Sequence, residues 1–440
     1  MRLRAWLCLA LSSISIASVS SAARPRYGGT LTLDLSGTFN SPEASDLPPI
    51  LSPLVAETLT RINGRGELEP RLASAWQPEA ETKRWRISLR ANVFFQDGQP
   101  LNAGNVAPGL LDELKKQFEN ITVLAGGQTL VIQADHALPD LPLQLANPRF
   151  AITRKSENNL VIGTGPFRLS GWEPRRRLTL TAFDDYWGGR PYLDSIVVNL
   201  ASSVSSNADL FDIPFASPRR IVPEGPRIWV SHPRELLALV AASDIQPVIL
   251  QALAASIDRA PIVNVLAQRQ GQAAFGLLPQ WLTGYEFLFQ TMPDLARARQ
   301  LAAQIKLTPV TLGYPPGDSF ARAVAERVAL NAHDAGIAIQ PTANQNANLH
   351  LVRWPIESAD AAAELARIAA LLGAADRVNG LEANKPETLY EAERGLLESN
   401  RVIPVVHLPL VLGTAHRVHF DGSATADQLT PNLAGCWVDR

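Results

Sequence analysis

The sequence predicts an α/β protein built from more than one compact unit. Its 440 residues are too many for a single hydrophobic core. Hydrophobic residues make up 46% and charged residues 19% of the chain, the composition of a folded protein. Residues 309–341 alternate between strand, amphipathic helix and strand patterns. This rhythm favours a parallel sheet flanked by helices.

The first residues have the pattern of a secretory signal. Arg2 and Arg4 precede an apolar run, Ala5–Val19, and small residues suited to signal peptidase follow that run. We expect cleavage after about Ala22 or Ala23, and therefore a periplasmic protein.

The two cysteines predict neither a lipid anchor nor a disulfide. Cys8 follows Trp6 and Leu7, where a lipid-attachment site needs small residues, so the chain is not expected to be a lipoprotein. Signal removal leaves Cys436 as the one thiol, and one thiol cannot form an internal disulfide. Beyond the signal there is no run of 18 or more apolar residues, and we expect a soluble mature chain.

Charge and motif content argue against several function classes. The formal net charge is −2 and the arginines are scattered, so the chain lacks the basic stripe of a nucleic-acid-binding protein. No HExxH, GxSxG, SxxK or paired CxxC occurs, and we predict no enzymatic activity, no cofactor and no metal site. His416 and His419 fall on opposite faces of an extended segment, and His350 and His407 are expected to be strand residues with satisfied ring nitrogens.

Residues 66–106 predict a compact run of short elements. Pro70 is expected to open a helical turn that reaches Trp76. Alternation over 84–90 predicts a strand with one buried face. A short strand at Phe94-Phe95 meets the turn dipeptide Asp97-Gly98, and Asn102 is expected to cap a helix that begins at Ala103.

The remaining elements follow from periodicity and turn residues. In the first half of the chain we predict a strand at 30–35, a helix and turn over 51–63, two strands over 119–135 joined by Gly126-Gly127, and strands over 163–200. The Ser- and Pro-rich stretch 202–233 is predicted to cross from the first lobe to a second lobe. Beyond it we predict helix over 237–268 with starts at Pro247 and Pro261, strand, helix and strand over 309–341, a strand at 350–355, helices at 359–373 and 386–400, and an extended segment at 402–418.

Several of these strings together resemble family 5 of the bacterial extracellular solute-binding proteins, the oligopeptide, dipeptide and nickel receptors of ABC importers. The family shows G-x-L-x-P-x-L-A-x-x-W followed by F-x-D-G-x-P-L-x-A-x-D-V. The chain keeps Gly66, Leu68, Pro70, Leu72, Ala73, Trp76, Leu89, Arg90, Phe95, Asp97, Gly98, Pro100, Leu101, Ala103 and Val106. It departs at Gln96, where the family often has histidine, and at Asn105, where it usually has aspartate. The strings GTGPFRLSGW (163–172), DDYWGGRPYLDSI (184–196) and ALAASIDR (252–259) resemble further family signatures.

The resemblance implies a two-lobed periplasmic-binding-protein fold of type II, in the large peptide-receptor class, with an extra subdomain inserted in the first lobe. The expected boundaries are 1–22 for the signal peptide, 23–60 with 162–232 and 405–440 for lobe 1, 61–161 for the inserted subdomain, and 233–404 for lobe 2. The implied function is a periplasmic receptor that captures a peptide or similar small solute between its lobes and delivers it to a membrane permease.

One string suggests where the solute binds. Peptide-binding relatives have G-W-x-A-D-Y-x-D-P at the cleft, where the first aspartate pairs with the α-ammonium group of the ligand, and this chain has RWPIESADA. The resemblance assigns Trp354, Glu357 and Asp360 as ligand-binding residues. Glu357 carries one methylene more than aspartate and could still form a charge-assisted bond to an ammonium group. Alternatively, Glu357 lies in the first turn of the following helix, where the helix dipole favours an acid.

Two other functions stay open on the sequence. A sensor would present its liganded form to a membrane receptor without import. A secreted hydrolase would need a nucleophile and base, for which the sequence has no motif. Under the receptor hypothesis, the partners are a small-molecule or peptide ligand and an ABC permease and ATPase complex, with no nucleic acid, and the protein is a monomer.

Overall fold

The structure is a computed structural model of the whole chain. It describes residues 24–35, 41, 47–48, 50–63, 67–155, 160–200, 208–212, 227–242, 245–304, 309–344, 346–378, 381, 385–399, 401–420 and 431–439. The expected signal peptide and most of the expected crossing over 202–233 lie outside these residues.

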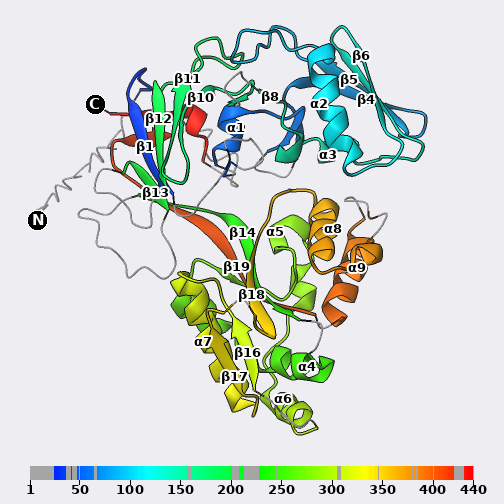
Figure 1. Cartoon of the computed structure of the whole chain (residues 1–440), viewed down its shortest axis with the longest axis vertical. Coiled ribbons are helices and arrows are strands. Elements are labelled where there is room, and N and C mark those ends of the chain that lie inside the picture. Colours follow the sequence, from blue (N-terminus) through cyan, green and yellow to red (C-terminus); the bar gives the residue numbers. More distant parts are fainter. Residues whose placement is uncertain are drawn as a thin grey trace, which may run out of the picture.

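One large sheet runs through the molecule (Figure 1). Its strand order is β10-β11-β12-β1-β13-β19-β14-β18-β16-β17, and β15 pairs with β19 beside this path. The strands are β1 (Thr30–Leu35), β10 (Phe167–Glu173), β11 (Arg177–Ala182), β12 (Ser195–Leu200), β13 (Leu210–Asp212), β14 (Arg227–Ala241), β15 (Gln272–Ala273), β16 (Val310–Gly313), β17 (Ile339–Thr342), β18 (Leu349–Pro355) and β19 (Val402–Thr414).

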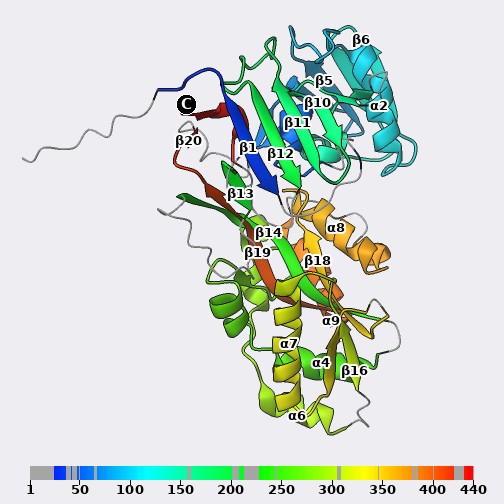
Figure 2. The same ribbon diagram turned by 60° about the vertical axis from the view of Figure 1, so that its left-hand side comes forward.

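The long strands β14 and β19 join two lobes, as both ribbon views show (Figures 1 and 2). We call the half that contains β1 and β10–β13 lobe 1, and the half that contains β16–β18 lobe 2. At one end β19 pairs with β13 of lobe 1, and at the other end β14 pairs with β18 of lobe 2. The two strands are antiparallel to each other from Arg227↔Thr414 to Val240↔Val402. A single pair of strands therefore passes from one lobe into the other.

Lobe 2 covers its sheet with helices on both faces. Side chains alternate along β14, so that Leu237 and Leu239 join one core while Leu236 and Ala238 join the other. The first core packs against α4 (Pro247–Ser256), α6 (Leu295–Ala302) and α7 (Ser319–Asp334). The second packs against α8 (Ala361–Leu371) and α9 (Pro386–Glu398). Strand β16 runs parallel to β17 and β18, which confirms the predicted parallel pairing.

Lobe 1 packs its sheet against the short helix α1 (Ser52–Val55). The helix approaches the chain at Gly163 and Gly165 so closely that a Cβ at Gly163 would lie 2.0 Å from the Val55 carbonyl oxygen. A Cβ at Gly165 would lie 2.4 Å from the Leu54 carbonyl oxygen. The glycines of the GTGPF string thus allow two backbone segments to touch.

A four-stranded sheet with its own core adjoins lobe 1. We call it the α2 unit. Its strand order is β4-β5-β7-β6, and its elements are β4 (Ala73–Glu79), β5 (Arg84–Leu89), α2 (Ala103–Lys115), β6 (Thr122–Gly126), β7 (Thr129–Gln133) and α3 (Leu141–Gln144). The buried residues Trp85, Ile87 and Leu89 of β5 pack in this core. The Asn102 side chain caps α2 by accepting the N–H of Asn105, as predicted.

Short elements complete the described chain. These are β2 (Thr60–Ile62), β3 (Leu68–Pro70), β8 (Arg154–Lys155), β9 (Val161–Ile162), β20 (Val418–Phe420), β21 (Cys436–Val438), α5 (Gln280–Thr283), the 3₁₀ helices η1 (Pro148–Phe150), η3 (Glu286–Phe289), η4 (Ala375–Val378) and η6 (Leu433–Gly435), and the π-helix η2 (Ile262–Leu266). Among the described residues, no helix combines the length and apolar character needed to cross a membrane.

Three predicted elements are wrong. The predicted short strand at Phe94-Phe95 is a single antiparallel bridge between Phe94 and Pro100. Pro70 ends β3 instead of opening a helical turn, and the residues up to Trp76 belong to β3, β4 and the bend between them. Strand β4 lies at the edge of its sheet, where Pro78 is tolerated. Residues 237–241 form the end of β14 instead of a helix. A strand covered on both faces is apolar throughout, so its sequence lacks the alternation that distinguishes a strand from a buried helix.

The close approach at Gly163 gives a test of the junction with α1. We expect Gly163→Ala to lower the free energy of unfolding by at least about 2 kcal/mol, because the new methyl group would overlap a carbonyl. Gly109→Ala is the matched control, since Gly109 lies in exposed helix α2 with open space around it. This control should raise stability by about 0.5–1 kcal/mol. Equal unfolding curves for Gly163→Ala and the parent in urea would contradict the observed packing.

Candidate functional site

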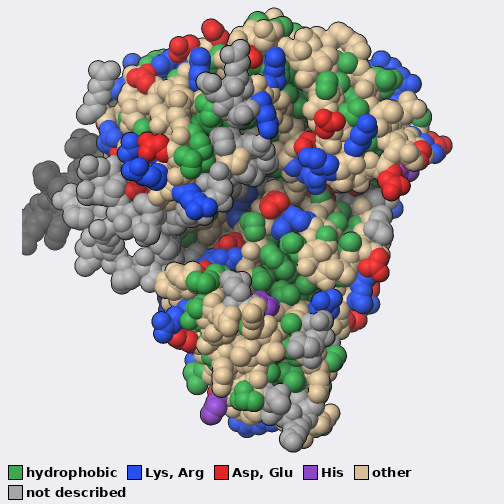
Figure 3. Space-filling model, in the orientation of Figure 1, with side chains coloured by type: hydrophobic (Ala, Val, Ile, Leu, Met, Phe, Trp, Pro, Cys, Tyr) green, Lys and Arg blue, Asp and Glu red, His purple; other side chains and the backbone are tan. Residues whose placement is uncertain are grey.

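The surface is hollowed between lobe 1 and lobe 2 (Figure 3). Positive and negative side chains lie along both edges of the hollow, and hydrophobic side chains gather on lobe 2 below it, over α5. The end of β18, the start of α8 and the middle of β14 contribute the lobe 2 residues considered next.

The three predicted ligand residues lie in one stretch with different environments. Trp354 is on β18 opposite Leu236 of β14, is 9% exposed and packs in the core next to α8. The side chain of Glu357 is 52% exposed. Helix α8 begins at Ala361 after its cap at Asp360, so Glu357 lies outside the first helical turn. The helix-dipole alternative for Glu357 is therefore wrong.

Asp360 is a buried helix cap. One of its oxygens, Oδ1, accepts the N–H groups of Ala362 at 2.9 Å and Ala363 at 3.1 Å. The other, Oδ2, is buried without a hydrogen-bond partner. Burial raises the pKa of Asp360, and the charge of Asp140, at the start of α3, raises it further. The α2 unit and lobe 2 thus bring two like charges near each other.

A buried ion pair holds the loop that carries Glu357. Glu364 is 1% exposed and accepts the backbone N–H groups of Glu357 and Ser358, both at 3.2 Å. Its other oxygen accepts the Arg367 Nε–H at 3.0 Å, and burial raises the pKa of Glu364. Arg367 Nε also lies 3.9 Å from the Glu357 carboxylate. Glu357 is consequently held by its backbone while its carboxylate stays open to solvent beside one guanidinium.

The middle of β14 adds an aromatic pair and an arginine to this edge. The rings of His232 and Trp281 stack with centroids 5.7 Å apart and planes 22° apart. The indole N–H of Trp281 donates to the Pro233 carbonyl at 2.8 Å. The backbone N–H of Ile356 donates to the carbonyl of Arg234, the residue after Pro233, at 2.6 Å. These contacts form a continuous strip from Trp281 to Glu357.

Buried charged groups fix the segment that carries Trp281. Glu393 of α9 accepts the N–H groups of Leu277 (2.5 Å) and Leu278 (3.1 Å), and its other oxygen accepts the Tyr285 hydroxyl at 2.9 Å. Burial raises the pKa of Glu393 to about 7. Nearby, the Arg259 guanidinium donates to the Ala274 carbonyl at 2.7 Å. The loop on either side of α5 therefore has a defined place on lobe 2.

The described histidines and carboxylates do not gather into a metal site. Among the described residues, no group of three or more His, Cys, Asp or Glu could hold a metal ion. His350 and His407 are on strands β18 and β19 as predicted. The His407 side chain is buried, and the backbone of Gly276 is the polar group next to its ring. Burial lowers the pKa of His407 to about 4, although the backbone of Gly276 opposes part of this shift.

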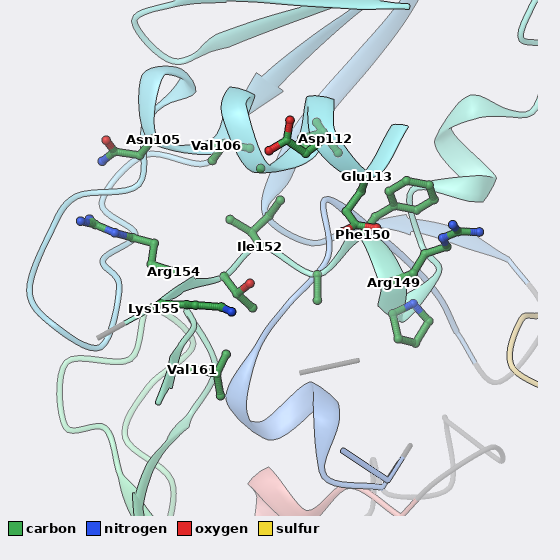
Figure 4. Close-up of a pocket in the computed structure, with 15 residues that line it drawn as sticks. Asn105, Val106, Asp112, Glu113, Arg149, Phe150, Ile152, Arg154, Lys155 and Val161 are labelled. Atoms are coloured by element: carbon green, nitrogen blue, oxygen red, sulfur yellow. The ribbon is translucent and has the colours of Figure 1, made fainter. Parts of the chain in front are cut away.

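A separate groove of about 310 Å³ lies in the α2 unit (Figure 4). Asp112 and Glu113 of α2 lie on one side of it and Arg154 and Lys155 of β8 on the other, with Ile152 between them. The Arg154 guanidinium lies over the Phe95 ring, 5.4 Å from its centroid. None of the residues that line this groove belongs to the strip from Trp281 to Glu357.

Sequence reasoning found part of this strip and missed the rest. It selected Trp354, Glu357 and Asp360 from one local string. It missed Trp281 and Arg234, since no local signal connects residues that meet only through strand pairing. The spacing of Glu364 and Arg367, three residues apart on a helix, is a signal that could have indicated their ion pair.

One protein family matches part of the chain. The model of the bacterial extracellular solute-binding proteins, family 5 (middle region), matches residues 67–212. Over these residues the chain is similar to family 5. This match includes the α2 unit and much of lobe 1, with the strings at 163–172 and 184–196, whereas the string at 252–259 lies outside it. Proteins of family 5 are extracellular or periplasmic solute-binding receptors.

Individual relatives agree with family 5. The nickel-binding protein NikA of Staphylococcus aureus is 32% identical over 178 residues, which cover 38% of this chain and 36% of NikA. The dipeptide-binding protein of Escherichia coli K12 is 22% identical over 286 residues, covering 50% of this chain and 52% of that protein. The alignments with these two relatives therefore span about a third to a half of their length.

Solved structures show the same fold over nearly the whole chain. Staphylococcus aureus NikA in complex with Ni(L-His)₂ superposes with a TM-score of 0.78 at 20% identity and covers 93% of this chain and 100% of that one. DppA of Helicobacter pylori in complex with the peptide STSA gives 0.77 at 16% identity and covers 94% and 99%. The fold of this chain is thus the type II fold of peptide- and nickel-binding proteins, as predicted.

The raised pKa of Glu393 predicts how stability depends on pH. The folded protein keeps a proton on Glu393 up to about pH 7, whereas the unfolded chain releases it near 4.5. The stability that this group contributes is therefore present below the unfolded pKa and lost as the pH rises through 7. Between pH 5.5 and 8.5, the stability of the parent should fall by about 2 kcal/mol relative to Glu393→Gln.

Urea unfolding of both proteins across this range measures that difference, because the other titrating groups are common to both. A constant difference between them would show that Glu393 is already ionised in the folded protein at pH 5.5.

Proposed function

We propose that this protein is the periplasmic solute-binding receptor of an ABC import system. The solute binds in the hollow between the lobes, the lobes close around it, and the closed form delivers it to a membrane permease. The observation that carries this proposal is the pair β14–β19, which joins two lobes beside a hollow with charged side chains along both of its edges (Figure 3). The match of residues 67–212 to family 5 supports it.

The proposed solute is a peptide or a similar small molecule with an ammonium group. The exposed carboxylate of Glu357 would hold that group by a charge-assisted bond, and Trp281 on α5 would offer an apolar surface beside it. Trp354 and Asp360 support the same edge of lobe 2 from below. The peptide held by Helicobacter pylori DppA agrees with this class.

The remaining expectations belong to the same proposal. The signal peptide is removed after about Ala22 or Ala23, and the mature chain works as a monomer without catalysis. The α2 unit forms the subdomain inserted at 61–161, lobe 1 comprises 23–60, 162–232 and 405–440, and lobe 2 spans 233–404. Sensing without transport is the alternative, and neighbouring genes for two permeases and two ATPases would favour transport. Turnover of generic esterase or peptidase substrates would instead support a hydrolase.

Glu357 gives the sharpest test of the solute site. A library of short peptides is first screened against the purified mature chain by thermal shift. We expect Glu357→Gln to weaken the best peptide about 10- to 100-fold by calorimetry, since a charge-assisted bond is lost. Acetylating the peptide N-terminus should weaken binding to the parent similarly and add little to the loss in Glu357→Gln.

Glu326→Gln is the matched control, because Glu326 is a carboxylate on α7, which packs against the other face of the lobe 2 sheet. It should leave the affinity unchanged. Unchanged affinity in Glu357→Gln as well would remove Glu357 from the site. Failure of all peptides to bind, together with the absence of any solute in native mass spectra of protein purified from its own periplasm, would count against the receptor itself.

A further inference from the structure

The strand pair that joins the lobes is irregular at its middle. From Val230 to Glu235, β14 advances five residues, while its partner β19 advances only three, from Val411 to Leu408. Two register shifts lie on either side of Pro233, and such bulges bend and twist a strand pair locally. Closer to lobe 2 the register shifts once more, between Leu237 and Ala238. The two shifts next to Pro233 fall within a few residues, which we call the joint: residues 231–234 and 408–410.

Backbone hydrogen bonding is weakened at the joint. Pro233 stands opposite Pro409, and neither proline has an N–H group with which to bond the other strand. The N–H of Leu410 donates to the hydroxyl oxygen of Ser231 at 2.8 Å instead of to a carbonyl of β14. A side chain thus replaces a ladder bond where the lobes meet.

Trp281 supplies the second such side-chain bond. Its indole N–H donates to the Pro233 carbonyl at 2.8 Å, and its ring stacks on His232, the preceding residue of β14. Trp281 does not belong to the strand pair. It is carried by α5, whose flanking loop is fixed to lobe 2 by Glu393 and Arg259. The joint is consequently held from the side by a residue that moves with lobe 2.

Helix α5, which carries Trp281, lies in the part of lobe 2 that faces lobe 1 (Figure 1). Hydrophobic side chains gather on lobe 2 below the hollow (Figure 3), and Trp281 is half-buried. Its ring contacts His232. A solute that packs against α5 would therefore touch the residue that bonds the joint.

We propose that Trp281 couples solute binding to lobe closure by holding the Pro233 carbonyl at the joint. The inference rests on the proposed receptor function. Closure requires β14 and β19 to bend between the lobes, and the joint is the place where their backbone ladder offers least resistance. Trp281 sets the direction of the Pro233 carbonyl in the open form, and a solute that shifts the indole changes that bond. Trp281 is thus a positioning residue for closure.

Hydrogen exchange without any solute tests the coupling at the joint. Trp281→Phe keeps an aromatic ring and removes the N–H donor. We expect amide exchange in peptides that span 230–236 and 408–412 to become about five- to tenfold faster, because a bond that restrains local opening is lost. Ser231→Ala is a second variant that removes the partner of the Leu410 N–H and should accelerate exchange over 408–412.

Trp76→Phe is the matched control, since Trp76 lies on β4 of the α2 unit. It should leave exchange at the joint unchanged. Unchanged exchange at the joint in a folded Trp281→Phe protein would overturn the proposal. If Trp281→Phe does not fold, unchanged exchange in Ser231→Ala would overturn it, because the joint would then not depend on side-chain bonds.

Closure itself is measured with one label on each lobe and a peptide that binds the parent. We expect Trp281→Phe to bind with a reduced change in the distance between labels, and an unchanged distance change would argue against coupling. The two proposals fail separately. If no peptide binds, native mass spectra show no solute and exchange at the joint still accelerates, the receptor function fails and the role of Trp281 at the joint stands.

Discussion

The buried carboxylate of Glu57 holds lobe 1 and the α2 unit together. It accepts the hydroxyl of Tyr186 and the indole N–H of Trp187, both at 2.8 Å, and the hydroxyl of Thr164 at 3.0 Å. Arg71 pairs with it at 2.5 Å. A buried charge without partners would be destabilising, and these donors satisfy both of its oxygens. The donors come from three distant parts of the chain, so lobe 1 and the α2 unit depend on one another for this contact.

The same junction explains why particular strings identify the family. Thr164 belongs to the GTGPF string and Tyr186 to the YWGG string. The hairpin at Asp97-Gly98 joins them through Gln96, whose amide N–H₂ donates to the carbonyls of Val55, Gly165 and Phe167 and whose oxygen accepts the Gly163 N–H. Gln96 is a departure from the family pattern, and here a side-chain amide serves as a donor and an acceptor at once. The strings that resemble the family therefore form the contact between lobe 1 and the α2 unit.

Local chemistry could be predicted from the sequence, whereas long-range pairing could not. The cap at Asn102 and the turn at Gly98, whose φ is +83°, depend on neighbouring residues, and alternation predicts β5 directly. The sequence around Ala73 predicts a helical turn where the structure has a strand, because a short apolar run fits the period of a helix as well as that of a strand. The site divides in the same way: Glu357 belongs to one local string, while Trp281 reaches Pro233 only through the tertiary fold. The burial of Glu393 could not be predicted from the sequence, because a glutamate in an amphipathic helix normally faces solvent.

The contacts of Glu57 and the joint at Pro233 divide the molecule into two bodies. The junction at Glu57 makes lobe 1 and the α2 unit one body, and the joint at Pro233 separates that body from lobe 2. Across the gap, Asp140 of the first body raises the pKa of Asp360 of the second. Like charges resist the approach of the two bodies, and a positively charged group between them would relieve that resistance.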